Sequence, residues 1–151
     1  MADLTLKQQI QEAMKAAMRA QDKETLNAVR LMLAAIKQIE VDERIEVDDA
    51  RALIILDKML KQRRDSISQF SAANRQDLVQ KEEFEVKVIQ SFMPQPLSQD
   101  DIALLLTEAL GETGAASVRD MGKVMAWLKP KVQGRTDLGA LGALIKARLS
   151  E

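Results

Sequence analysis

The chain has 151 residues, of which 46% are hydrophobic and 30% are charged, and its formal net charge is −1 at pH 7. Cysteine and histidine are both absent, which excludes disulfides, thiol nucleophiles, zinc sites of the usual spacing and histidine-based proton transfer. The hydrophobic content is enough to fill a core, and only 3% of the residues are aromatic, a class that strands usually contain. The composition therefore favours a folded, helical protein.

A pattern of apolar residues at helical spacing begins near the start of the chain. Thr5 and Gln8 have the form of a capping box, so a first helix is expected from there to about Ala20. Asp22 can cap a second helix. Apolar residues recur at helical spacing along one side of that second helix: Leu26, Val29, Leu33, Ile36 and Ile39.

A long third helix and a fourth helix are predicted next. The acidic stretch 41–49 is the expected turn before the third helix, because acids favour a helix N-terminus. The third helix should stop near Ser71, where small residues interrupt the pattern, and the fourth is expected over 75–92. Their inner faces should consist of Leu53, Leu56, Leu60, Ile67, Phe70, Leu78, Val86, Ile89 and Phe92.

The clearest boundary is Met93-Pro94-Gln95-Pro96. Two prolines around one residue prevent helical hydrogen bonding and favour an extended backbone. We therefore predict an N-terminal domain over 1–93, a linker over 94–97 and a C-terminal domain over 98–151. The predicted fold class is all-α, with an N-terminal four-helix unit joined by the proline linker to a small three-helix unit.

Caps and stop signals define the three C-terminal helices. Ser98 starts the first, and Gly111 suits the left-handed residue that ends many helices. Ser117 caps the second, which Pro130 should halt, and Asp137 can cap the last. The side chains expected to face inward are Ile102, Leu105, Leu106, Leu110, Val118, Met121, Met125, Leu128, Leu138, Leu141, Leu144, Ile145 and Leu149.

Some residues in this domain have two interpretations. Gly122 lies in mid-helix, where glycine costs about 1 kcal/mol relative to alanine. We favour close approach of two helices, for example Gly122 against Gly142, over a surface left bare for a partner's backbone. For Trp127, the only tryptophan, we favour core anchoring over base stacking.

Positive charge gathers in the segment 117–137, SVRDMGKVMAWLKPKVQGRTD, which contains five cations and two acids. Like charges without partners repel one another, so such a segment is either a solvated face or a site for an anionic ligand. The candidate nucleic-acid-binding residues are Arg119, Lys123, Lys129, Lys131 and Arg135.

Two further groups of charged residues carry weaker signals. Lys61, Arg63 and Arg64, together with Arg75 after the break that follows the third helix, could form a second phosphate-binding strip. We favour a solvated face, because that is what a charge run on one helix usually is. The carboxylates within 82–85 lack histidine or a compact loop of alternating acids, so no metal site is predicted.

The C-terminal strings MGKVMAWLKPKVQGRTD and IKARL resemble the module shared by YqeY-like proteins and the GatB component of the glutamine-dependent aspartyl/glutamyl-tRNA amidotransferase. The residues that match the module's pattern are Met121, Gly122, Lys123, Val124, Pro130, Lys131, Gly134, Arg135, Asp137 and Lys146. Thr136 and Leu138 depart from it. The strings TLNAVRLMLAAIKQIEVD, DKMLKQRRDSISQF, NRQDLVQKEEFEV and FMPQPLS extend the resemblance to the stand-alone YqeY branch over nearly the whole chain.

The resemblance implies a role that the residues limit. In GatB-like proteins, activation chemistry belongs to a larger domain, glutamine hydrolysis belongs to another protein of the complex, and the C-terminal tail helps to grip tRNA. At the family level this implies carbon-nitrogen ligase activity with glutamine as the amide donor. The chain has no activated cysteine or serine nucleophile and no phosphate-cradling glycine loop. We therefore expect no catalytic residue and no cofactor.

The expected function is that of a non-catalytic accessory protein that binds tRNA or another structured RNA. The nearly neutral net charge and the sequence pI of about 5.7 count against it. The alternatives are a helical adaptor that docks on a translation-related protein complex, and a small enzyme with an unrecognised site. Without disulfides, a secretory signal or a membrane-spanning run, we expect a cytoplasmic protein with no membrane partner.

Overall fold

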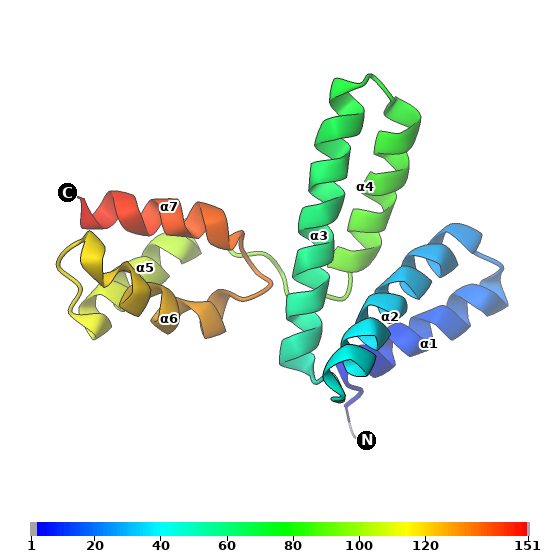
Figure 1. The fold of residues 1–151 in the computed structure, drawn as a ribbon, viewed down its shortest axis with the longest axis horizontal. Helices are drawn as coiled ribbons and strands as arrows, with labels where there is room; N and C mark the ends of the chain where they lie inside the picture. The colour runs from blue at the N-terminus through cyan, green and yellow to red at the C-terminus, as the bar shows by residue number, and fades with distance from the viewer. Residues whose placement is uncertain (1–2, 151) are drawn as a thin grey trace. The chain divides into compact units, whose positions relative to one another are not determined.

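The computed structural model describes residues 3–150, which form seven α-helices, one 3-10 turn and no strand (Figure 1). The predicted all-α fold class is therefore confirmed. The chain divides into two compact units, with the boundary between Met93 and Pro94. We call them the N-terminal unit and the C-terminal unit, and describe each by itself.

The N-terminal unit consists of two helical hairpins. Its helices are α1 (Leu6–Ala20), α2 (Lys23–Glu43), α3 (Asp49–Ala72) and α4 (Gln76–Gln90). α1 packs along α2, and α3 packs along α4 (Figure 1). One apolar core joins the hairpins, and its most buried side chains include Ile10, Val29, Met32, Ile36, Leu56 and Ile89.

Two carboxylates hold the junction of α1, α2 and α3. Lys7 Nζ donates to both oxygens of Glu40, at 3.0 and 2.8 Å, and the Val47 N–H donates to Glu40 Oε2 at 3.0 Å. These bonds, the one from Lys7 first, hold the pKa of Glu40 below its ordinary value. The N–H of Leu6 donates to Asp49 Oδ1 at 2.8 Å. Contacts far apart in sequence thus fix the start of α1.

The C-terminal unit is built around one central helix. It contains α5 (Gln99–Thr113), the 3-10 turn Val118–Asp120, α6 (Met121–Val132) and α7 (Leu138–Leu149). α5 and α7 both pack on α6 but make few contacts with one another. The core of this unit consists of Leu106, Ala109, Val124, Leu128, Val132, Leu141 and Ile145.

Several helix ends differ from the sequence expectations, among them the following. α2 runs to Glu43, so the turn before α3 begins later than residue 41. α5 passes Gly111 and is capped by Gly114, whose φ of 66° is least strained without a Cβ. α6 continues two residues beyond Pro130, because the proline ring fixes a φ that suits a helix and removes only one hydrogen bond in the last turn.

Some side chains expected inside this unit lie outside. Val118 is 40% exposed and Leu144 is 47% exposed. Among residues 3–150, a Cβ built on Gly122 would meet no other part of the chain within 4 Å, and one on Gly142 would meet only Met125 Cε at 3.9 Å. The predicted close approach of helices at Gly122 and Gly142 is therefore wrong, and Gly122 lies on an open surface.

Candidate nucleic-acid interface

The cations of α6 lie on the side of the helix that faces away from the core. Val124, Leu128 and Val132 are buried, whereas all three lysines of α6 are exposed. At about 100° per residue, Lys123 lies near the middle of the exposed side, and Lys129 and Lys131 lie toward its two edges. The surface between Lys129 and Lys123 is formed by exposed small or rigid residues: Gly122, Ala126 and Pro130.

Asp120 fixes the start of α6. Its Oδ2 accepts hydrogen bonds from the N–H groups of Ala116 and Ser117, at 2.9 and 3.3 Å. These bonds, the one from Ala116 first, hold the pKa of Asp120 below its ordinary value. Lys123 Nζ lies 4.0 Å from Asp120 Oδ1, an exposed pair that offsets little of the lysine charge.

Lys131 stacks on the indole one helical turn before it. Its Nζ lies 3.9 Å from the centroid of the Trp127 ring, which is cation–π distance. Trp127 is partly buried and packs against the core of the C-terminal unit. This placement favours core anchoring over base stacking, because the lysine already covers one face of the ring.

Arg135 ties the loop after α6 to the segment before α5. Its Nε donates to the Gln95 carbonyl at 3.0 Å, and its own carbonyl accepts from the Leu97 N–H at 2.9 Å. The side chain is half-buried. Arg135 thus has a structural role that the sequence analysis missed, and nucleic-acid binding by it stays a prediction.

Arg119 and Lys129 have no such role. Both side chains are exposed, and within residues 3–150 neither has an ion-pair or hydrogen-bond partner. Four candidates, all except Arg135, are therefore exposed cations on α6 and the turn before it. We call this set, Arg119, Lys123, Lys129 and Lys131, the cationic face.

The second proposed strip, on α3, is broken at its centre. Arg63 Nε lies 2.7 Å from Glu85 Oε2 and 3.5 Å from Glu82 Oε2, so this guanidinium is paired across the α3–α4 interface. Lys61 and Arg64 remain exposed. The pairing removes Arg63 from the solvent-facing charge run.

Glu82 and Glu85 form a partly buried acidic cluster on α4, at the carboxylates for which no metal site was predicted. Glu85 is buried, and the Oε2 of Glu82 is buried without a hydrogen bond. Burial first, and then the neighbouring Glu85 carboxylate, raises the pKa of Glu82 above its ordinary value. The three-residue spacing of these acids on one side of α4, opposite an arginine, was a signal for this cluster.

Neither a cluster of potential metal ligands nor a helix fit to span a membrane occurs in the described part of the chain. Between residues 3 and 150, no group of three or more acidic side chains could hold a metal ion. None of the helices within that range is both long and apolar enough to span a bilayer.

Comparison with protein families identifies the chain over nearly its whole length. Residues 7–149 match the family described as Yqey-like protein. The chain belongs to the YqeY family. This confirms the family resemblance seen in the sequence.

Curated relatives of this YqeY-family chain include fungal proteins named "Altered inheritance of mitochondria protein 41, mitochondrial". The protein from Lachancea thermotolerans is 29% identical over 93% of this chain and 76% of its own length. The one from Eremothecium gossypii is 41% identical over 56% of this chain and 46% of its own length. The one from Saccharomyces cerevisiae strain YJM789 is 39% identical over 58% of this chain and 48% of its own length. The chain thus aligns with about half the length of the last two.

These names contradict the predicted cytoplasmic location. The relatives are named as mitochondrial proteins. The prediction rested on the absence of disulfides, a secretory signal and a membrane-spanning run, and none of these features distinguishes the cytoplasm from the interior of an organelle.

Proposed function

We propose that this YqeY-family protein is a non-catalytic accessory protein that binds the phosphate backbone of a structured RNA, with tRNA as the first candidate. The observation that carries the proposal is the cationic face. Its four side chains are exposed, and the only one with an acidic partner within residues 3–150 is Lys123, which makes a long surface pair with Asp120. A polyanion would offset the repulsion among them.

Charge is unevenly distributed along the sequence of the C-terminal unit. α5 carries four acids and no lysine or arginine, whereas the segment 117–137 carries five cations and two acids. A unit polarised in this way presents positive potential on one surface while its total charge stays small. The pI of the whole chain therefore does not argue against local binding of RNA.

The shape of α6 suits a phosphate backbone. Gly122, Ala126 and Pro130 are exposed and project little or no flexible side chain between the lysines. A phosphate chain could therefore approach the helix closely while flanking ammonium groups contact its oxygens. Contacts of this kind position an RNA by shape and charge and do not read its sequence.

Fluorescence anisotropy with labelled, unfractionated tRNA at low salt tests the proposal. A charge-reversal variant combines Lys123→Glu, Lys129→Glu and Lys131→Glu, and its matched control reverses the exposed lysines 23, 58 and 87. We expect the α6 variant to bind at least about tenfold more weakly than the control. Equal affinities would exclude the cationic face, and absence of binding by the wild-type protein would exclude the function.

A further inference from the structure

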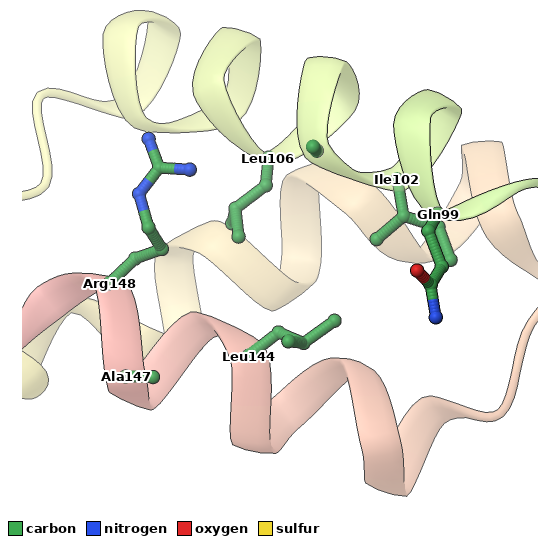
Figure 2. A pocket seen from close by; sticks show the side chains of 7 residues that line it. Gln99, Ile102, Leu106, Leu144, Ala147 and Arg148 are labelled. Atoms are coloured by element: carbon green, nitrogen blue, oxygen red, sulfur yellow. The ribbon is translucent and has the colours of Figure 1, made fainter.

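A separate feature of the C-terminal unit is an apolar groove between α5 and α7 (Figure 2). The groove exists because both helices pack on α6 while making few contacts with one another. Its volume is about 370 Å³, within the range of small-molecule sites. Ile102 and Leu106 from α5 and Leu144 from α7 supply its larger apolar side chains.

Polar side chains stand at the two ends of the groove. Arg148 reaches from α7 toward α5 (Figure 2). There its Nη2 donates to Thr107 Oγ1 at 3.3 Å. The Thr107 hydroxyl in turn donates to the Ala103 carbonyl at 3.1 Å, which orients it to accept from Arg148. Gln99 lies at the other end (Figure 2). The arginine bridge bounds the groove, so it suits a short ligand better than a continuous helix of a partner protein.

The charge of the groove determines which ligand it would accept. Among residues 3–150, Arg148 is the only charged residue in the lining. Within residues 3–150 its guanidinium has no partner other than Thr107, so several N–H donors are available. Leu144 is 47% exposed, which is costly for a leucine beside an open apolar surface. An apolar chain would cover Leu144, and an acidic head group would pair with Arg148.

We propose that this groove binds a small anionic amphiphile, with its aliphatic chain along Ile102, Leu106 and Leu144 and its carboxylate on Arg148. The stretch of α5 from Gln99 to Thr107 is about 12 Å long at 1.5 Å per residue, which suits a medium-length chain. The guanidinium supplies charge-assisted hydrogen bonds to the carboxylate. This site uses none of the residues of the cationic face and does not depend on RNA binding.

Titration calorimetry with decanoate, below the concentration at which it forms micelles, tests the proposal on the full-length protein. We expect saturable binding of one decanoate per chain, with backbone NMR shifts confined to α5 and α7. Decyltrimethylammonium has the same chain length and the opposite charge, and should bind at least about tenfold more weakly. Equal binding of the two probes, shifts located on α6, or no binding of decanoate would overturn the proposal.

Matched variants distinguish the contribution of the ligand's carboxylate from that of its aliphatic chain. Arg148→Gln should weaken decanoate binding about tenfold or more, whereas Lys146→Gln on the exposed side of α7 should leave it unchanged. Leu144→Ser should also weaken binding, whereas Leu104→Ser, at a position that is 71% exposed and outside the groove, should not. Both positions are exposed, so neither change removes a core side chain. Unchanged binding in Arg148→Gln or in Leu144→Ser would contradict the assigned site.

Discussion

Lys131 Nζ lies 3.9 Å from the centroid of the Trp127 ring, one helical turn earlier on α6. The lysine belongs to the cationic face, and the indole packs against the core of the C-terminal unit. Trp127 is also the only tryptophan of the chain. The pair therefore places an optical reporter directly beside a proposed phosphate contact.

Binding of RNA should change the fluorescence of Trp127. A phosphate that pairs with Lys131 draws its ammonium away from the ring, which alters the electrostatic surroundings of the indole. We expect an emission change that saturates with added tRNA in the wild-type protein and in Lys61→Gln, and that is lost in Lys131→Gln. An unchanged emission at tRNA concentrations that saturate the anisotropy signal would place the RNA elsewhere.

Arg135 should matter for stability. Arg135→Lys keeps the charge but cannot reproduce the Nε hydrogen bond to Gln95, so we expect the free energy of unfolding to fall by about 1 kcal/mol. Arg119→Lys, at an exposed position without a partner among residues 3–150, serves as the control and should change little. Urea unfolding followed by circular dichroism measures both. If Arg135→Lys unfolds like the wild type but binds RNA less tightly, its role is phosphate binding instead.

Two glycines should respond to alanine in opposite directions. Gly122 lies within α6 and a Cβ there would meet nothing, so Gly122→Ala should stabilise the protein by about 0.5 to 1 kcal/mol. Gly114 has a φ of 66°, so Gly114→Ala should destabilise it by about 1 kcal/mol. Melting temperatures of the two variants give the signs. A destabilised Gly122→Ala would indicate that this surface is covered in the native protein.

The stability of the N-terminal unit should depend on pH through two glutamates of opposite behaviour. The raised pKa of Glu82 means that folding disfavours its ionised form. The ionised carboxylate therefore lowers the free energy of unfolding at neutral pH, and this loss fades as the pH falls toward the ordinary pKa of 4.5. Glu82→Gln should therefore unfold at higher urea concentration than the wild type at pH 7, with the difference shrinking toward pH 4.5.

Glu40 provides the contrast. Its pKa is lowered by the hydrogen bonds from Lys7 and Val47. The ionised carboxylate therefore adds to the free energy of unfolding above pH 4.5, and this contribution is lost as the pH falls through the depressed pKa. Glu40→Gln should be less stable than the wild type at pH 7 and approach it in acid. Urea unfolding of the three proteins between pH 3 and pH 7 checks both signs, and parallel curves for all three would contradict this assignment of the charges.

Features encoded by neighbouring residues could be predicted from the sequence. The caps at Thr5, Asp22, Ser98 and Asp137 all form, because each depends on a side chain bonding to backbone a few residues away. The ends of helices were harder to predict. The apolar pattern of α5 runs to Leu110, and both Gly111 and Gly114 follow it, so the sequence does not indicate which glycine ends the helix. The all-α class followed from composition and periodicity alone.

Features that depend on tertiary arrangement could not be read in this way. The spacing of Leu144 predicted a buried residue, but its burial depends on how closely α7 approaches α5. The sequence indicated a free cation at Arg135, because its hydrogen-bond partner Gln95 lies forty residues away in the chain and is brought close only by folding. The pairing of Arg63 with Glu82 and Glu85 likewise requires the α3–α4 hairpin to be formed.

If α6 binds RNA through phosphate contacts, the affinity for tRNA must fall as salt is added. Anisotropy titrations over a range of salt concentrations give the slope of log K against log salt, which counts the phosphates that the protein neutralises. We predict a steep negative slope for the wild type that becomes shallower by about two to three in the variant with Lys123, Lys129 and Lys131 changed to glutamate. A slope near zero, or one that these three substitutions leave unchanged, would show that α6 does not bind RNA through phosphate contacts.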